Sequence, residues 1–297
     1  MRKRVAAIGT FDGVHRGHKS VLKALTDYAK AHDMEPVAIT FNRHPLALID
    51  PSRIPAELTP LWKKKKLLQE AGAMPMILNF DEPLRATTAR QWMKHLREQF
   101  QVEALVIGYD NTFGCDGIHL SIEDYKNIGK EEGVDVLTAD EIKGVSSSAI
   151  RKSVKAGEME TAHEMLGRPF SITAPVVRGN SLGHTIGFPT ANIEIPDGAA
   201  LPKSGVYAGI VKTLTDGVKH PAMINIGTRP TVMRGDHIVI EAHIINWNGD
   251  LYGKDITVRF LKRLRDEQKF DSIDALKRQL ALDRTASLEI VSELSGR

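Results

Sequence analysis

The spacing of apolar residues changes about halfway along the chain, and this change constrains the fold more than any other feature of the sequence. In the first half, segments of helical periodicity alternate with four short apolar runs, at residues 5–8, 36–41, 74–80 and 102–107. Such an alternation predicts an α/β domain in which helices cover both faces of a parallel sheet. In the second half, apolar residues recur at every second position, which predicts strands with one buried face. We therefore expect two domains of different class.

Local signals refine the first of these domains. A helix is expected over residues 18–32, where the apolar residues form one stripe. Another helix is expected to begin at Thr88, because Thr88 and Gln91 have the spacing of a capping box. Both helices lie between predicted strands, as an α/β domain requires.

Turn signals organise the second domain. Residues 215–217 and 248–249 are typical hairpin turns, and the alternation over residues 238–244 predicts a strand between them. The segment from Arg168 to about Arg263 should therefore form an antiparallel sheet or a small β-barrel.

The two ends of this second domain are also marked in the sequence. A last helix is expected over residues 272–282, and helical residues end near residues 157–167. We therefore divide the chain into residues 1–158 and 159–297. A length of 297 residues agrees with two domains.

Charge and cysteine content exclude several classes of protein. Lys and Arg number 40 against 37 Asp and Glu, and this net charge of +3 permits anionic partners without selecting nucleic acid. The lysines at residues 63–66 are interpreted as the solvated side of a helix rather than a nucleic-acid patch. The one cysteine, Cys115, excludes an intramolecular disulfide and a zinc site of the thiolate type.

No segment has the ~18 consecutive apolar residues that a membrane span needs. The apolar stretch near the N-terminus ends at Gly9, so it is too short for a signal peptide. We expect a cytoplasmic protein that binds neither nucleic acid nor membrane, and the sequence does not indicate an oligomeric state.

A candidate phosphate site follows the first predicted strand. The strand runs directly into Gly9, Thr10, Phe11, Asp12 and Gly13, and then into a helix. This arrangement directs backbone N–H groups and the positive end of the helix towards an anion. Glycines at this turn allow a ligand to approach the backbone closely.

Two histidines lie at the start of the same helix. His15 and His18 are three residues apart, so both imidazoles could face one phosphate and stabilise charge in a transition state. The alternative is a glycine-rich turn with two surface histidines.

Two motifs in this half resemble those of one superfamily. Residues 15–18, His-Arg-Gly-His, resemble the His-x-Gly-His signature of nucleotidyltransferases, which transfer AMP or CMP from a nucleoside triphosphate and release pyrophosphate. Residues 146–151 resemble the superfamily's Ser-Ser-Thr-x-Ile-Arg motif. The resemblance implies that Ser147, Ser148 and Arg151 hold the triphosphate beside the glycine-rich turn.

The flanking residues narrow the resemblance to the FMN adenylyltransferase module of bacterial FAD synthetases. Residues 10–15, 40–45 and 108–114 are similar to segments of that module, and the residue matching Asp110 helps to place ATP and flavin there. After Gly114 this chain has Cys-Asp-Gly where the family usually has a basic Gly-Lys-x-Arg segment.

The second half resembles riboflavin kinases. Residues 187–192 contain their Pro-Thr-Ala-Asn motif, and residues 178–184 resemble their flexible loop over ATP, which implies nucleotide contacts from Gly179, Gly183 and His184. Thr190 and Asn192 supply a hydroxyl and an amide oxygen, which suit Mg²⁺ that also carries ATP phosphates.

Further segments match the kinase family in the same order, at residues 204–209, 225–231, 249–254 and 264–270. The resemblance implies that Asn225 and Arg265 border the flavin.

Glu241 is the candidate base of the kinase half. It lies in the alternating strand, on the face opposite Ile240 and Ala242. An acidic residue on a strand is more often solvated than catalytic. In riboflavin kinases, however, the matching glutamate accepts the proton of the 5′-hydroxyl, which phosphoryl transfer from ATP requires.

Taken together, the chain resembles a bacterial bifunctional FAD synthetase. The resemblance implies a Rossmann-like nucleotidyltransferase domain followed by a small antiparallel β-barrel kinase domain with a C-terminal helix. Riboflavin and ATP would give FMN, and FMN with a second ATP would give FAD and pyrophosphate, with Mg²⁺ as cofactor. Two alternatives stay open: a riboflavin kinase with a weakened N-terminal domain, and a non-catalytic flavin-binding regulator.

Overall fold

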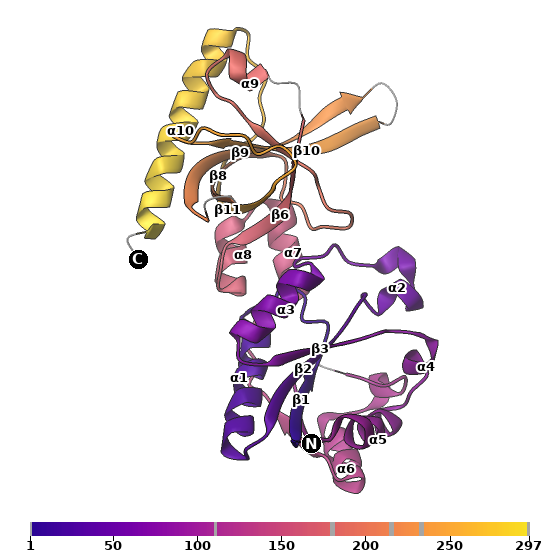
Figure 1. The fold of residues 1–297 in the computed structure, drawn as a ribbon. Coiled ribbons are helices and arrows are strands. Elements are labelled where there is room, and N and C mark those ends of the chain that lie inside the picture. The colour runs from indigo at the N-terminus through magenta and orange to yellow at the C-terminus, as the bar shows by residue number, and fades with distance from the viewer. Residues whose placement is uncertain (1, 110–111, 179–181, 214–216, 232–234, 296–297) are drawn as a thin grey trace. The chain divides into compact units, whose positions relative to one another are not determined.

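The computed structural model describes residues 2–109, 112–178, 182–213, 217–231 and 235–295. The chain divides into two compact units, Met1–Ser147 and Ser148–Arg297, and each has its own sheet (Figure 1).

The first unit is built on a parallel sheet of five strands in the order β3-β2-β1-β4-β5. The strands are β1 (Arg4–Ile8), β2 (Glu35–Phe41), β3 (Met74–Leu78), β4 (Val102–Ile107) and β5 (Asp135–Thr138). All four strands expected from the apolar runs are present, which confirms the α/β interpretation; β3 ends two residues before the predicted position.

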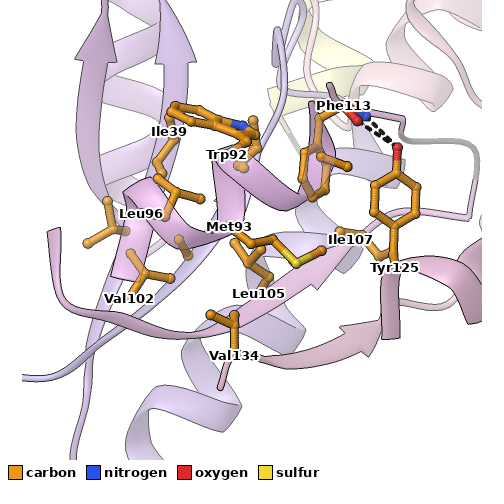
Figure 2. Packing of buried hydrophobic residues seen from close by; sticks show 14 residues of the cluster. Ile39, Trp92, Met93, Leu96, Val102, Leu105, Ile107, Phe113, Tyr125 and Val134 are labelled. Atoms are coloured by element: carbon orange, nitrogen blue, oxygen red, sulfur yellow. Dashed lines mark hydrogen bonds between the residues drawn. The ribbon is translucent and has the colours of Figure 1, made fainter. Parts of the chain in front are cut away.

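Helices cover both faces of this sheet, as predicted. The helices and 3-10 turns of the unit are α1 (Arg16–Ala31), α2 (Leu46–Ile49), η1 (Pro51–Arg53), α3 (Leu61–Glu70), α4 (Glu82–Arg85), α5 (Ala89–Phe100), η2 (Gly117–His119) and α6 (Ile122–Glu132). Side chains of β1 alternate between two cores: Val5 and Ala7 pack with α1 and α3, whereas Ala6 and Ile8 pack with α5 and α6. Figure 2 shows the second of these cores around Trp92, Met93 and Tyr125.

The helix starts follow the local signals. Thr88 and Gln91 form the predicted capping box at the start of α5. One expectation was wrong: Lys64 is buried rather than solvated, because it falls on the same helical face of α3 as Leu68.

The second unit contains a closed antiparallel barrel with the strand order β10-β7-β6-β11-β8-β9. Its strands are β6 (Phe170–Val177), β7 (Ala191–Ile193), β8 (Gly205–Thr213), β9 (Lys219–Thr231), β10 (Gly235–Ile244) and β11 (Asp255–Arg265). Its helices are α7 (Ser147–Ala156), α8 (Met159–Leu166), α9 (Leu182–Thr185) and α10 (Ile273–Ser295). The predicted barrel is thereby confirmed.

The two predicted hairpins have different outcomes. β8 and β9 pair as neighbours, so a hairpin joins them, although residues 214–216 of its turn lie outside the described residues. The hairpin predicted at residues 248–249 was wrong, because β10 pairs with β7 and β9 whereas β11 pairs with β6 and β8. Barrel closure gives each of these strands other neighbours, which local turn residues do not indicate.

The C-terminal helix was predicted too short. α10 continues to Ser295, beyond the predicted end at residue 282, and buries Asp283, Ser287 and Val291. Among the described residues, no helix is long and apolar enough to cross a membrane.

Candidate active sites

The glycine-rich turn after β1 has an unusual backbone. Phe11, Gly13 and Val14 have positive φ angles of 47°, 86° and 38°, and the Val14 N–H donates to the Phe11 carbonyl at 3.1 Å. Positive φ is uncommon for a phenylalanine or a valine, and strained backbone of this kind occurs mainly at functional sites. The turn therefore has the geometry of a ligand loop as well as its sequence.

Asp12 lies in the middle of this turn with its side chain directed into the protein. It is 4% exposed, and its carboxylate accepts the N–H groups of Leu58 and Thr59 at 3.0–3.1 Å. Asp12 thus holds a distant segment against the turn.

His15 and His18 lie together at the start of α1, as their spacing predicted. His15 caps the helix, with its Nδ1 accepting the His18 N–H at 3.2 Å, and the two rings stack at 3.6 Å between centroids. Because Nδ1 accepts, the proton of neutral His15 is on Nε2, where it can be donated to a ligand. A Cβ atom on Gly17 would lie 3.1 Å from the His15 ring, so glycine leaves room for that ring.

The second nucleotidyltransferase motif begins beside the same turn. The Ser147 hydroxyl donates to the Asp12 carbonyl at 2.8 Å, although the two residues are far apart in sequence. Ser148 and Arg151 follow on α7, in the part of the chain that belongs to the second unit. Asp110 lies outside the described residues.

The segment that departs from the family pattern is fixed to the start of α5. The Cys115 N–H donates to the Thr87 carbonyl at 2.9 Å, and the Asp116 carboxylate accepts the Ala89 N–H at 2.7 Å. Here an acidic side chain holds the loop where the family usually has basic residues.

In the second unit, one cavity of about 450 Å³ brings together most of the residues predicted for the kinase. Six of them line it: Gly183, Thr190, Asn192, Asn225, Glu241 and Arg265. Gly179 lies outside the described residues, as does the side chain of His184.

Strand register explains why these residues meet. Glu241 of β10 is paired with Asn192 of β7 on one side and with Asn225 of β9 on the other. Val206 of β8 is in turn paired with Asn225 and with Arg265 of β11. Paired residues project from the same face of a sheet, so this register row places the side chains side by side.

Arg265 is held by the C-terminal helix. Its Nη2 donates to Asp283 at 2.7 Å and its Nε contacts both carboxylate oxygens at 3.1 Å, while Asp283 is 3% exposed. The guanidinium therefore joins β11 to α10 at the wall of the cavity.

Other residues of this cavity were not predicted as site residues, among them Phe188, His243 and Glu267. Glu267 accepts a hydrogen bond from the Asn225 amide at 3.3 Å. Burial lowers the pKa of His243, a hydrogen bond with Pro189 opposes this, and the charge of Arg284 adds to the lowering. His243 follows Glu241 by two residues, so the alternation of the strand could have identified it.

A smaller cavity of about 90 Å³ adjoins the first at Thr190, which lines both. Its wall contains Ala242, Trp247, Leu251 and Tyr252, so it is largely apolar and aromatic. Thr190 thus lies between a wide cavity and a narrow apolar one.

The donor groups fit Mg²⁺ bound together with phosphates better than a metal held by protein alone. Among the described residues, no three His, Cys, Asp or Glu side chains are grouped as a metal site. Thr190 and Asn192 offer neutral oxygens on one cavity wall. Mg²⁺ typically takes few protein ligands when substrate phosphates supply the others.

Known families and proteins match both units. The family model described as FAD synthetase matches residues 1–153, and that described as riboflavin kinase matches residues 166–291. A bifunctional riboflavin kinase/FMN adenylyltransferase from Escherichia coli strain K12 is 37% identical over 96% of this chain and 92% of that protein. One of the same description from Bacillus subtilis strain 168 is 31% identical over 98% of this chain and 94% of that protein.

Among solved structures, one described as a macrolide-efflux protein from Streptococcus pneumoniae is similar in fold. Its TM-score is 0.87 at 30% identity, covering 96% of this chain and 94% of that chain. With both family models matched in order and relatives aligned over nearly their whole length, this chain belongs to the bifunctional riboflavin kinase/FMN adenylyltransferase family.

Proposed function

We propose that the chain phosphorylates riboflavin in the barrel and adenylylates the resulting FMN at the glycine-rich turn of the first unit. The main support is the register row in which Asn192, Glu241 and Asn225 adjoin one another on the wall of a single cavity. We further propose that the domain boundary falls between residues 158 and 159 and that the protein is cytoplasmic.

In the kinase reaction, Glu241 accepts the proton of the riboflavin 5′-hydroxyl. The hydroxyl oxygen then forms a bond to the γ-phosphorus of ATP, and the bond to the bridging oxygen breaks to release ADP. Thr190 and Asn192 would hold Mg²⁺, which neutralises charge on the phosphates when it is bound. The apolar cavity beside Thr190 suits the adenine, and the wide cavity suits the flavin.

In the adenylyltransferase reaction, an oxygen of the FMN phosphate attacks the α-phosphorus of ATP, and pyrophosphate leaves. His15 and His18 donate to the phosphate oxygens that gain charge. Backbone N–H groups of residues 9–13 and the side chains of Ser147, Ser148 and Arg151 hold the triphosphate. Direct displacement is supported by the sequence neighbours of the two histidines, Val14, Arg16, Gly17 and Lys19, which carry no hydroxyl, thiol or carboxylate group.

Product analysis tests both reactions in one experiment. The purified chain is incubated with riboflavin, ATP and Mg²⁺, and flavins are separated by chromatography. FMN and then FAD are expected. FMN without FAD would leave only the kinase, and no conversion of riboflavin would favour the non-catalytic regulator.

Two variants assign the reactions to their sites. Glu241→Gln should reduce FMN formation by about 10²-fold or more, because it removes the base and keeps the shape. His18→Ala should reduce FAD formation from added FMN by about 10²-fold. Asp255→Asn and His119→Ala, which change exposed residues, serve as controls. If either variant lost both activities to the same extent, the assignment of each reaction to its own site would be contradicted.

A further inference from the structure

His243 connects the strand that carries Glu241 to the segment that carries Thr190. It lies two residues after Glu241 on β10, on the same face, and lines the same cavity. Its Nδ1 is 2.8 Å from the Pro189 carbonyl oxygen. A carbonyl only accepts, so Nδ1 carries the proton and donates it.

The His243 side chain joins β10 to the segment before β7 at a point where the backbone ladder has ended. The ladder between β7 and β10 ends at the pair Ala191 and Ala242. One position further along β10, the imidazole of His243 reaches the peptide between Pro189 and Thr190 instead. The orientation of that peptide is thereby fixed directly before Thr190.

The ring also supports the residue before Pro189. Phe188 meets the edge of the His243 ring at 5.3 Å between centroids, with an angle of 61° between the planes. The Phe188 N–H in turn donates to the Gly183 carbonyl at 2.8 Å. His243 therefore holds the segment that runs from α9 to β7 by one hydrogen bond and one aromatic contact.

The protonation state suits this role. Burial is the main cause that lowers the pKa of His243, so the ring is neutral near pH 7. A neutral donor orients the segment without adding a positive charge next to the groups that receive the phosphates.

We propose that His243 is a positioning residue for phosphoryl transfer, whose Nδ1–H holds the Pro189–Thr190 peptide so that Thr190 faces the cavity beside Glu241. This inference rests on the kinase reaction proposed above. It assigns His243 no proton transfer and no contact with substrate.

Two substitutions separate the ring nitrogens. The side-chain amide nitrogen of asparagine reaches about as far as Nδ1, whereas that of glutamine reaches about as far as Nε2. If the hydrogen bond from Nδ1 positions the segment, His243→Asn should keep kcat/KM for ATP in FMN formation within about 3-fold of the unaltered chain. His243→Gln and His243→Ala should lose about 10-fold or more, because small misplacement of reacting groups is costly. His163→Gln on α8 is the control.

Hydrogen exchange supplies a measurement independent of activity. Amides of residues 183–192 should exchange faster in His243→Gln than in the unaltered chain, and His243→Asn should restore slow exchange. If the unaltered chain made no FMN, the proposed function would fail, yet the exchange comparison would still test the positioning role.

Several results would overturn the inference. One is an Asn variant that loses as much activity as the Gln variant, and another is unchanged activity in all three. A rise in KM for riboflavin as large as the loss in kcat/KM for ATP would mean that His243 shapes the cavity proposed for the flavin instead. Should the Gln and Ala variants fail to fold, the Asn variant decides: near-full activity with slow exchange supports the role, and a tenfold loss contradicts it.

Discussion

At the residue scale, two charged side chains within the motifs form hydrogen bonds inside the protein. Asp12 belongs to the glycine-rich turn, yet its carboxylate binds the backbone of Leu58 and Thr59 inside the protein. Arg265 lines the cavity proposed for the flavin, yet its guanidinium is bonded to Asp283. Both charges are used to fix segments that are distant in sequence. The family motif at these positions therefore includes residues that shape the site as well as residues placed to contact ligands.

Gly9 offers a test of ligand approach at this scale. A Cβ atom there would lie 3.6 Å from its nearest neighbour, in the Phe11 ring, which is an ordinary contact. Gly9→Ala should therefore change the free energy of unfolding by less than about 0.5 kcal/mol. Because ATP is proposed to lie against this backbone, KM for ATP in FAD formation should rise by about 10-fold.

The matched comparison is Gly13→Ala, at a φ of 86°. Alanine is strained there, so this variant should lose about 1 kcal/mol or more of stability together with activity. Chemical unfolding and FAD formation from added FMN measure both effects. A Gly9→Ala variant with parental KM would show that the nucleotide does not approach Gly9.

At the scale of elements, single side chains join segments that secondary structure alone leaves apart. Tyr125 of α6 donates its hydroxyl to the Phe113 carbonyl at 2.8 Å and accepts the Phe113 N–H at 2.9 Å (Figure 2). Phe113 comes directly before the loop that departs from the family pattern. The capping box predicted where α5 begins. Local signals of this kind did not indicate the bond to Phe113, because its partner is on another element.

Tyr125→Phe should destabilise the first unit by about 1–3 kcal/mol, because it leaves two buried backbone groups of Phe113 without the hydroxyl. Burial raises the pKa of Tyr125, so the unfolded chain releases the phenolic proton first as pH rises. The contribution of Tyr125 to the free energy of unfolding is thus fully present below pH ~10 and decreases as the pH rises above it.

Chemical unfolding at neutral and alkaline pH measures this effect. Tyr28→Phe is the control, because its hydroxyl bond to Asp135 is exposed and should contribute less than about 0.5 kcal/mol. If the two substitutions lowered the free energy of unfolding equally, the hydrogen bonds to Phe113 would not be what makes Tyr125 stabilising.

The contact between α10 and β11 leads to a second prediction about elements. Asp283→Asn keeps the shape but leaves the Arg265 guanidinium without its anion, which should cost about 2–3 kcal/mol. KM for riboflavin should rise more than kcat falls, because Arg265 lines the cavity proposed for the flavin and is separated from Glu241 by two strands of the register row. Steady-state FMN formation and thermal unfolding check this, with exposed Glu289→Gln on the same helix as control. A fall in kcat alone would contradict it.

At the scale of the whole molecule, the chain has two units with separate sheets. The kinase motifs lie in the second unit, whereas the nucleotidyltransferase motifs begin in the first and continue onto α7, which belongs mostly to the second. The register row of Asn192, Glu241 and Asn225 lies within the barrel strands, and the stacked histidines follow the first strand of the parallel sheet. Because FMN is a small soluble product, the two reactions do not need to occur in the same chain.

Mixing two variants tests this separation. Glu241→Gln retains the adenylyltransferase site and His18→Ala retains the kinase site. An equal mixture should therefore convert riboflavin to FAD, while each variant alone should produce little FAD. Chromatography of flavins over time measures both. Failure of the mixture, with each remaining activity intact in separate assays, would indicate that FMN is not released between the reactions.

The sequence alone determined the local features of this protein. Helix starts, strand positions in the first half, the glycine-rich turn and the two motif sets follow from residue types and short spacings, and the structure agrees with them. Such features depend on neighbours a few residues away, so they can be predicted from the order of residues.

Only the tertiary structure decided which distant residues meet. The wrongly predicted hairpin at residues 248–249 and the burial of the Asp12 carboxylate depend on long-range packing. So do the hydrogen bond between His243 and Pro189 and the bond between Arg265 and Asp283. Barrel closure sets the register that aligns Asn192, Glu241 and Asn225. A shift by one residue would turn these side chains to the opposite face, and buried Ile240 and Ala242 on that face prevent it.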